Sequence, residues 1–209
     1  MSIAFLFDIF GTIIFAITGA VKGIRNRLDL LGVLFFSITV GCGGGMVRDV
    51  LIGATPVAAF EEPAYFIVCI ITGLVVFLLS PYFVGRWSII VYCDAIGLGV
   101  FTALGVAKAA SMGIGVVGMV MSGTFAAVGG GIIRDVFSKE IPHVFTSDFY
   151  ATASIVASFF YVLLYRYSTI GQTELLVVTA LVATGLRIMG YCTNLRLPVA
   201  RMYGEKKRK

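Results

Sequence analysis

The sequence predicts an all-α integral membrane protein with seven transmembrane helices, built as two inverted three-helix repeats plus a seventh helix. Three observations lead to this prediction: a very apolar composition, a series of apolar runs, and an internal repeat. Of the 209 residues, 59% are hydrophobic and 13% are charged, whereas soluble domains average about 45–50% apolar and about 25% charged residues. This composition excludes an ordinary cytosolic enzyme, a disordered protein and a disulfide-rich secreted domain.

Seven apolar runs approach the ~20 residues that a membrane-spanning helix needs. They cover residues 3–21, 30–47, 64–79, 89–107, 114–133, 149–165 and 175–191, with charges, prolines or polar residues between them. We therefore expect a single membrane domain over residues 1–209. Its parts are repeat units at about 3–80 and about 89–166, a seventh helix at about 174–192 and a basic tail at 196–209.

The distribution of Lys and Arg predicts the orientation. The formal net charge is +5, and five basic residues lie between Arg201 and Lys209, so the excess is a tail and not a basic face for nucleic acid. Basic juxtamembrane segments mark the cytoplasmic side and attract anionic lipid. With seven spans, the N-terminus is then outside, and the inside loops carry Lys22, Arg25, Arg27, Arg86 and Lys139.

A shift of 86 residues superposes the two halves without a gap from Asp8 to Pro56. The matched pairs are Asp8/Asp94, Gly11/Gly97, Phe15/Phe101, Gly19/Gly105, Lys22/Lys108, Gly32/Gly118, Gly43–Gly45/Gly129–Gly131, Arg48-Asp49/Arg134-Asp135 and Pro56/Pro142. Chance similarity in an apolar chain would match Leu, Ile and Val instead. Each unit holds three spans, so the second copy enters the membrane from the opposite side, as in many transport proteins.

The repeated charges lie on helix faces that the spacing defines. Asp8, Gly11, Phe15, Gly19 and Lys22 fall on one face of the first helix, and their counterparts from Asp94 to Lys108 do so on the fourth. The glycines fit a seam of close helix packing, and both lysines are placed to snorkel from helix ends. The two aspartates lie some turns inside the mapped spans and are expected to face protein or to line a polar path, because a charge in a bilayer is costly.

The triple glycines are the most informative motif. Three consecutive glycines, each costing ~1 kcal/mol in a helix interior, predict a kink or an opening in the second and fifth helices. Freed carbonyls at such a break must line a cavity or be buried, and Arg48, Asp49, Arg134 and Asp135 follow one turn later. The alternative is a tight helix crossing, with an Arg–Asp pair that caps the end of each helix.

Other kinds of site are not expected. Cys42, Cys69, Cys93 and Cys192 lie in apolar runs without metal-ligand spacing. His143 is the only histidine, which argues against a histidine-based metal site or catalytic triad. We therefore predict no enzyme activity and no cofactor.

The sequence resembles the prokaryotic TRIC (trimeric intracellular cation) channels over about residues 5–195. The resemblance rests on two glycine-rich three-helix units, each with Gly-Gly-Gly-x-x-Arg-Asp, followed by a seventh helix. The resemblance implies a homotrimer in the plasma membrane of a prokaryote, with one potassium-permeable pore per protomer. The glycine-kinked second and fifth helices would frame that pore, with Lys108 as a voltage-responsive charge. The basic motif that the animal channels use for phosphoinositides is missing.

Three hypotheses therefore stand. The first is a potassium-permeable channel whose ion pathway involves Asp8, Gly43–Gly45, Arg48, Asp49, Asp94, Lys108, Gly129–Gly131, Arg134 and Asp135. The second is a secondary transporter for glycine or a similar zwitterion, because related membrane proteins with the doubled motif resemble such transporters and Arg48 or Arg134 would suit a carboxylate. The third is a membrane scaffold that transports nothing.

Overall fold

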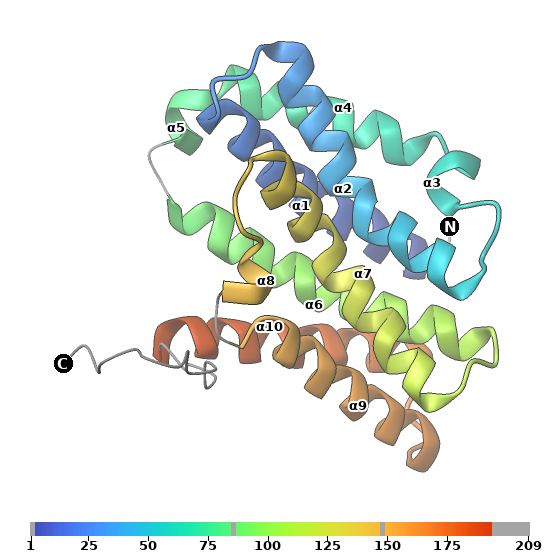
Figure 1. Cartoon of the computed structure of the whole chain (residues 1–209). Coiled ribbons are helices and arrows are strands. Elements are labelled where there is room, and N and C mark those ends of the chain that lie inside the picture. Colours follow the sequence, from blue (N-terminus) through green and yellow to red (C-terminus); the bar gives the residue numbers. More distant parts are fainter. Residues whose placement is uncertain (1–2, 85–86, 147–148, 194–209) are drawn as a thin grey trace, which may run out of the picture.

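The computed structural model describes residues 3–84, 87–146 and 149–193, which form ten helices joined by short loops (Figure 1). Five helices are long and apolar enough to cross a membrane: α1 (Ile3–Arg25), α2 (Leu30–Ile52), α6 (Trp87–Ser111, apolar from Ser88), α7 (Val116–Phe137) and α10 (Gln172–Thr193). Two apolar helices are shorter, α4 (Ala64–Leu78) and α9 (Ala151–Tyr167). The short helices are α3 (Ala58–Glu61), α5 (Ser80–Val84) and α8 (His143–Thr146).

All seven predicted runs fall on helices, and the main differences lie at their ends. The helices α1 and α2 continue four and five residues past their predicted ends, and in α2 the motif after the glycines stays helical. The apolar helix α4 has only 15 residues, since Pro63 precedes it and the backbone turns at Leu79. The predicted tail at 196–209 and Arg86 lie outside the described residues.

The repeat extends to the backbone conformation of the loops. After α1, Arg27 has a positive φ of 56°, and its counterpart Gly113 after α6 has a φ of 72°. After α2, Gly53 has a φ of 72°, and its counterpart Lys139 after α7 has a φ of 58°. The same left-handed residue therefore ends the helix in each copy, although glycine occupies it in only one copy each time.

Contacts between the halves are related by a two-fold axis. Phe15 and Phe101 stack on each other, with ring centroids 5.3 Å apart and planes 7° apart. Gly11 lies against Phe101, and Gly97 lies against Phe15, so α1 and α6 run antiparallel. The same reciprocity relates α2 to α7, because Gly44 packs on the Ala126 carbonyl and Gly130 on the Val40 carbonyl.

The triple glycines do not open their helices. Both α2 and α7 are continuous α-helices through Gly43–Gly45 and Gly129–Gly131. The expectation of an opened helix is therefore wrong, and the tight crossing is the arrangement found. Its physical reason is that glycines at a crossing let two backbones touch, and this packing offsets the low helix propensity of glycine.

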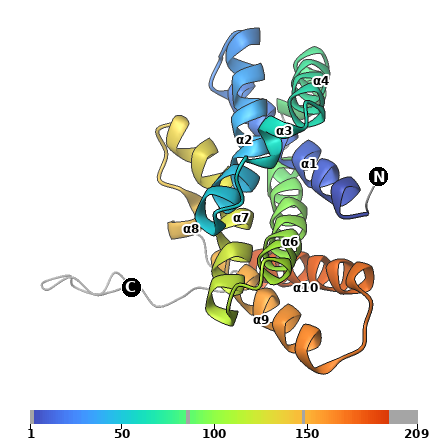
Figure 2. The same cartoon turned by 90° about the vertical axis from the view of Figure 1, so that its right-hand side faces the viewer.

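One long helix lies outside the repeat and breaks the symmetry. The helix α10 packs on α6 and α9, where Gly99 of α6 lies directly against the Ala180 carbonyl and Thr184. In Figure 2, α4 lies beside α1 and α2, whereas α9 and α10 lie beside α6. The outward faces of α4 and α9 carry exposed apolar side chains, including Ile71, Leu74, Phe159 and Leu163. Such a surface suits lipid, and the chain is a multi-pass membrane protein.

Candidate ion pathway

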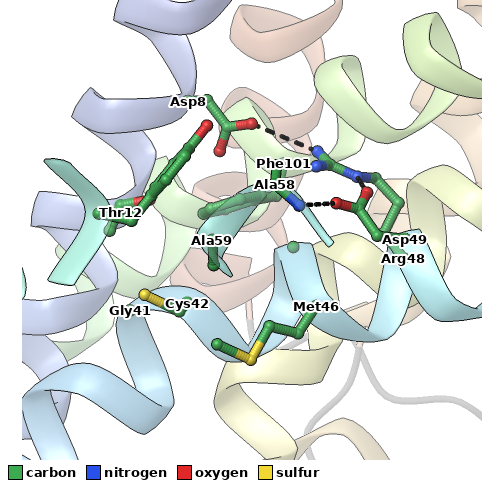
Figure 3. A pocket seen from close by; sticks show the side chains of 12 residues that line it. Asp8, Thr12, Gly41, Cys42, Met46, Arg48, Asp49, Ala58, Ala59 and Phe101 are labelled. Carbon is green, nitrogen blue, oxygen red and sulfur yellow. Dashed lines mark hydrogen bonds and ion pairs between the residues drawn. The ribbon is translucent and has the colours of Figure 1, made fainter. Parts of the chain in front are cut away.

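The first half holds a cluster of four charges from three helices, of which Arg48 and Asp49 are buried and Asp8 and Lys108 are partly exposed. Arg48 of α2 donates from Nε to Asp49 Oδ1 at 2.8 Å, and its Nη1 lies 3.6 Å from Asp8 Oδ2 of α1 (Figure 3). Lys108 of α6 donates to the same Asp49 oxygen at 2.7 Å. The other Asp49 oxygen accepts the backbone N–H of Ala58 at 3.1 Å, which fixes the start of α3.

The second half repeats the pairing of the arginine with two aspartates, with a shorter contact to the aspartate of the first helix in the repeat. Arg134 of α7 donates to Asp135 Oδ1 at 2.9 Å and to Asp94 Oδ1 of α6 at 2.7 Å. Asp135 Oδ2 accepts the backbone N–H of His143 at 2.9 Å, at the start of α8. Lys22, the counterpart of Lys108, binds Glu140 instead, at 2.6 Å. Charges at this depth need partners, and each Arg–Asp motif supplies them across helices.

A cavity of about 290 Å³ opens beside the first cluster. It is lined by Asp8, Arg48, Tyr65, Lys108 and Gln172, together with small and apolar residues of α1, α6 and α10. A much smaller pocket continues from Asp8 toward Thr12 and Phe101 (Figure 3). Its volume of about 10 Å³ is close to the space that one water molecule needs.

A second cavity, of about 210 Å³, lies beside the second cluster. Its polar lining includes Asp94, Arg134, His143, Tyr150 and Arg187. Because α1 and α6 are antiparallel, Asp8 and Asp94 lie toward opposite ends of the helix pair. The two cavities therefore approach the centre of the protein from opposite directions.

The phenyl rings of Phe15 and Phe101 lie between the two aspartates. Each ring is seven residues along its helix from its own aspartate, which is about 10 Å at 1.5 Å per residue. Both rings are fully buried, and Gly130 of the second triple glycine packs on Phe15. The stacked rings and the glycine crossing together fill the centre of the molecule between the cavities.

The structure thus groups the predicted residues into three sets. Asp8, Arg48, Asp49 and Lys108 form one cluster, and Asp94, Arg134 and Asp135 form another. Four of the six glycines form the crossing between α2 and α7. Gly45 and Gly131 instead face the arginine of their own motif and other side chains. Each arginine pairs with the aspartate that follows it and with the aspartate of the first helix in its own repeat.

Sequence reasoning missed three contributors to the site. Tyr65 and Tyr150 line the cavities, but tyrosines near the ends of apolar runs give no specific signal. Arg187 gave a usable signal, because it is the only charged residue in the apolar run at 175–191. It is buried on α10, and its guanidinium lies 4.6 Å from the centroid of the Tyr150 ring.

Comparison with known proteins places the repeat in a family. The family described as "Glycine transporter" matches residues 5–81 and 91–166, which are the two repeat units. A UPF0126 membrane protein of Vibrio cholerae is 40% identical over 162 residues, covering 77% of this chain and 67% of the relative.

Solved TRIC cation channels share the fold. One TRIC structure has 33% identity and a TM-score of 0.87, covering 98% of this chain and all of that chain. The TRIC orthologue from Rhodobacter sphaeroides has 30% identity and a TM-score of 0.88, covering 93% of this chain and all of that chain. The chain therefore belongs to the membrane-protein family described as glycine transporter, and its resemblance to the prokaryotic TRIC channels is confirmed.

Proposed function

We propose that this protein is a cation channel that conducts potassium through each protomer. The observation that carries the proposal is the pair of cavities, each with an aspartate and an arginine, that approach the stacked Phe15 and Phe101 from opposite ends. A cation entering either cavity meets Asp8 or Asp94, the carboxylates that line the two cavities. The relationship to solved TRIC cation channels supports the same function.

The proposed pathway gives each residue class a role. Asp8 and Asp94 attract the cation, and Arg48 and Arg134 hold those carboxylates while no ion is present. Gly43, Gly44, Gly129 and Gly130 let α2 and α7 approach closely, so that a small shift at their crossing widens or narrows the route. Lys108 is 31% exposed as a side chain and sits at a cavity wall, where a voltage acts on its charge.

The proposal includes seven spans with inverted repeats and an outside N-terminus. The apolar character of α4 and α9 and the antiparallel arrangement of α1 and α6 support this topology. We also include a homotrimer, which the relationship to trimeric TRIC channels supports, and contact of the basic tail with anionic lipid on the cytoplasmic side. Chemical labelling in intact cells tests the orientation, with cysteines introduced at residues 2 and 209 of a variant in which the native cysteines are replaced.

Planar-bilayer recording of the purified protein tests the function. Under a potassium/sodium gradient we expect unitary currents that reverse toward the potassium potential and do not change when glycine is added. Silent bilayers, with protein shown to be inserted, would contradict the channel.

A glycine transporter is the second candidate. Two polar cavities on either side of a packed centre also suit alternating access, and each offers a guanidinium for a carboxylate. Saturable glycine uptake into matched vesicles, lost in Arg48→Ala and Arg134→Ala, is the result that would favour it.

Removing one ring of the central stack is expected to raise potassium flux. Phe15→Ala deletes a fully buried ring between the cavities and leaves space that water can fill from either side. Flux into vesicles, measured with a potassium-sensitive dye, should increase severalfold at a cost of about 3–5 kcal/mol in stability. Phe35→Ala is the matched control, because Phe35 stacks on Phe137 at the exposed surface and its loss should not change flux.

Removing a positively charged side chain from one cavity is expected to have the opposite effect on rectification from removing one from the other cavity. Lys108→Gln removes a positive charge from the first cavity, and Arg187→Gln removes one from the second. Each substitution should change the electrostatic energy of a potassium ion in its cavity by about 0.5–1 kcal/mol. The rate at which ions enter that cavity then changes about two- to fivefold. Current–voltage curves in symmetrical potassium should therefore bend in opposite directions for the two variants. Bending in the same direction would place both charges on one side.

A further inference from the structure

We propose that Asp135, Glu140 and His143 form a binding site for a zinc-like divalent transition-metal ion. Their candidate ligand atoms, two carboxylate oxygens and one imidazole nitrogen, all lie within 4.8 Å of one another. A histidine nitrogen with two carboxylate oxygens is a ligand set for Zn²⁺ and its first-row neighbours. Potassium, magnesium and calcium favour oxygen ligands alone.

The backbone holds the three residues together. All three come from one nine-residue segment that runs from the end of α7 to the start of α8. The Glu140 N–H donates to the Asp135 carbonyl at 3.0 Å, and the His143 N–H donates to the Asp135 carboxylate at 2.9 Å. Both donors are main-chain N–H groups, so these two bonds remain when the Glu140 or His143 side chain is substituted.

Two positive charges already lie on this cluster, because Arg134 donates to Asp135 Oδ1 at 2.9 Å and Lys22 contacts Glu140. Lys22 Nζ is 2.6 Å from Glu140 Oε2, with its side chain only 5% exposed. Lysine is a flexible point charge that can swing away, whereas a divalent ion carries twice its charge and makes coordination bonds. The ion would take over Glu140 from Lys22, so the two cations compete for the same carboxylate.

The first repeat lacks these ligands. A shift of 86 residues places Ala54 opposite Glu140 and Val57 opposite His143, while Asp49 matches Asp135. In that half, Lys108 binds Asp49 directly. The repeat thus keeps the buried aspartate in both copies, but the second copy adds an acid and an imidazole beside it. The second copy alone is equipped for a metal ion.

The site lies where an ion can arrive from water and act on the cavity. The Glu140 side chain is 47% exposed, and His143 lines the 210 Å³ cavity together with Asp94 and Arg134. If the proposed channel function holds, a bound divalent ion at this wall would oppose potassium entry. The site would then inhibit current from this side only.

Calorimetric titration of purified, tag-free protein with ZnCl₂ tests the binding without requiring ion conduction. We expect one Zn²⁺ per chain, at least tenfold weaker binding in both Glu140→Gln and His143→Ala, and tighter binding in Lys22→Met. Glu61→Gln, at an exposed acid of α3 away from the cluster, should bind as the unmodified protein does. Thermal melting without metal shows whether each variant is folded.

Two results would overturn the proposal: no saturable binding by the folded protein, or binding that neither Glu140→Gln nor His143→Ala weakens. Substitution with Co²⁺ gives a second readout, because nitrogen and oxygen ligation produces visible absorption bands that His143→Ala should change. Zinc binding in a protein that conducts no potassium would refute the channel and leave the metal site standing. Potassium currents that zinc does not change, in a protein that binds no zinc, would refute the metal site and leave the channel standing.

Discussion

Gly44→Ala is expected to destabilise the protein strongly, whereas Gly45→Ala is expected to be neutral or stabilising. A Cβ atom on Gly44 would collide with the Ala126 carbonyl oxygen and lie 3.5 Å from the Gly130 nitrogen. These are backbone atoms of α7, so they can retreat only if the helices separate. A Cβ on Gly45 would meet nothing closer than 3.8 Å, from Arg48 and Phe101 side chains.

The energies of these adjacent substitutions have opposite signs. Overpacking at a tight contact costs about 1–3 kcal/mol or more, and at Gly44 it falls on two helices at once. At Gly45 the added methyl group has room, and alanine gains about 1 kcal/mol in helix propensity over glycine. Comparing Gly44→Ala with Gly45→Ala therefore distinguishes the contribution of helix packing at the crossing from that of helix propensity.

Thermal unfolding of both variants in the same detergent measures this difference. For a chain of this size, ~1 kcal/mol corresponds to roughly 2–4 °C in the unfolding midpoint. We expect the unfolding midpoint of Gly44→Ala to fall by several degrees and that of Gly45→Ala to stay level or rise. Gly130→Ala, whose Cβ would lie 2.7 Å from the Val40 carbonyl oxygen, should behave as Gly44→Ala does. Equal midpoints for Gly44→Ala and Gly45→Ala would show that the crossing is not tight.

The glycine motif also shows how far sequence reasoning reached. The repeat correctly paired Gly44 with Gly130 and Arg48 with Arg134, because polar and small residues were matched at a constant shift. Sequence alone could not separate an opened helix from a close crossing. Both use glycine for its missing side chain, and the choice depends on whether another backbone lies opposite. Ala126 and Val40, which supply that backbone, carry no sequence signal.

The departures from symmetry were the least predictable part of the site. Lys22 and Lys108 are repeat partners, yet Lys108 binds Asp49 and Lys22 binds Glu140. Glu140 lies in a loop, where acids are common and its partner depends on packing. Arg187 was visible as a lone charge in an apolar run, but its cavity is made by α10 packing on α6. No repeat relationship predicts that contact.

Arg134→Gln is expected to be the most damaging single substitution among the charged residues. Arg134 is the cation that contacts both Asp94 and Asp135, and the three side chains are almost completely buried. Removing one partner of a buried ion pair costs about 3–5 kcal/mol, because the remaining charge stays buried without compensation. Here two carboxylates lose a partner, so we expect the unfolding midpoint to fall by roughly 6–20 °C.

Arg48→Gln is the matched comparison in the other repeat, and its cost should be smaller. Asp49 keeps Lys108 at 2.7 Å, and Asp8 borders the 290 Å³ cavity, where water can solvate its carboxylate. The Asp8–Arg48 contact is also longer, at 3.6 Å, than the 2.7 Å contact of Asp94 with Arg134. Two chemically identical substitutions at matched positions should therefore differ by several degrees in midpoint.

Adding Asp94→Asn to Arg134→Gln tests the physical cause. If the damage comes from an uncompensated buried carboxylate, neutralising Asp94 should restore part of the lost stability. If Arg134 matters mainly through its packed side chain, the double variant should be at least as unstable as the single one. Equal losses for Arg48→Gln and Arg134→Gln would mean that both clusters are equally hydrated. The two cavities would then be equivalent, and the asymmetry introduced by α10 and Glu140 would have no energetic consequence.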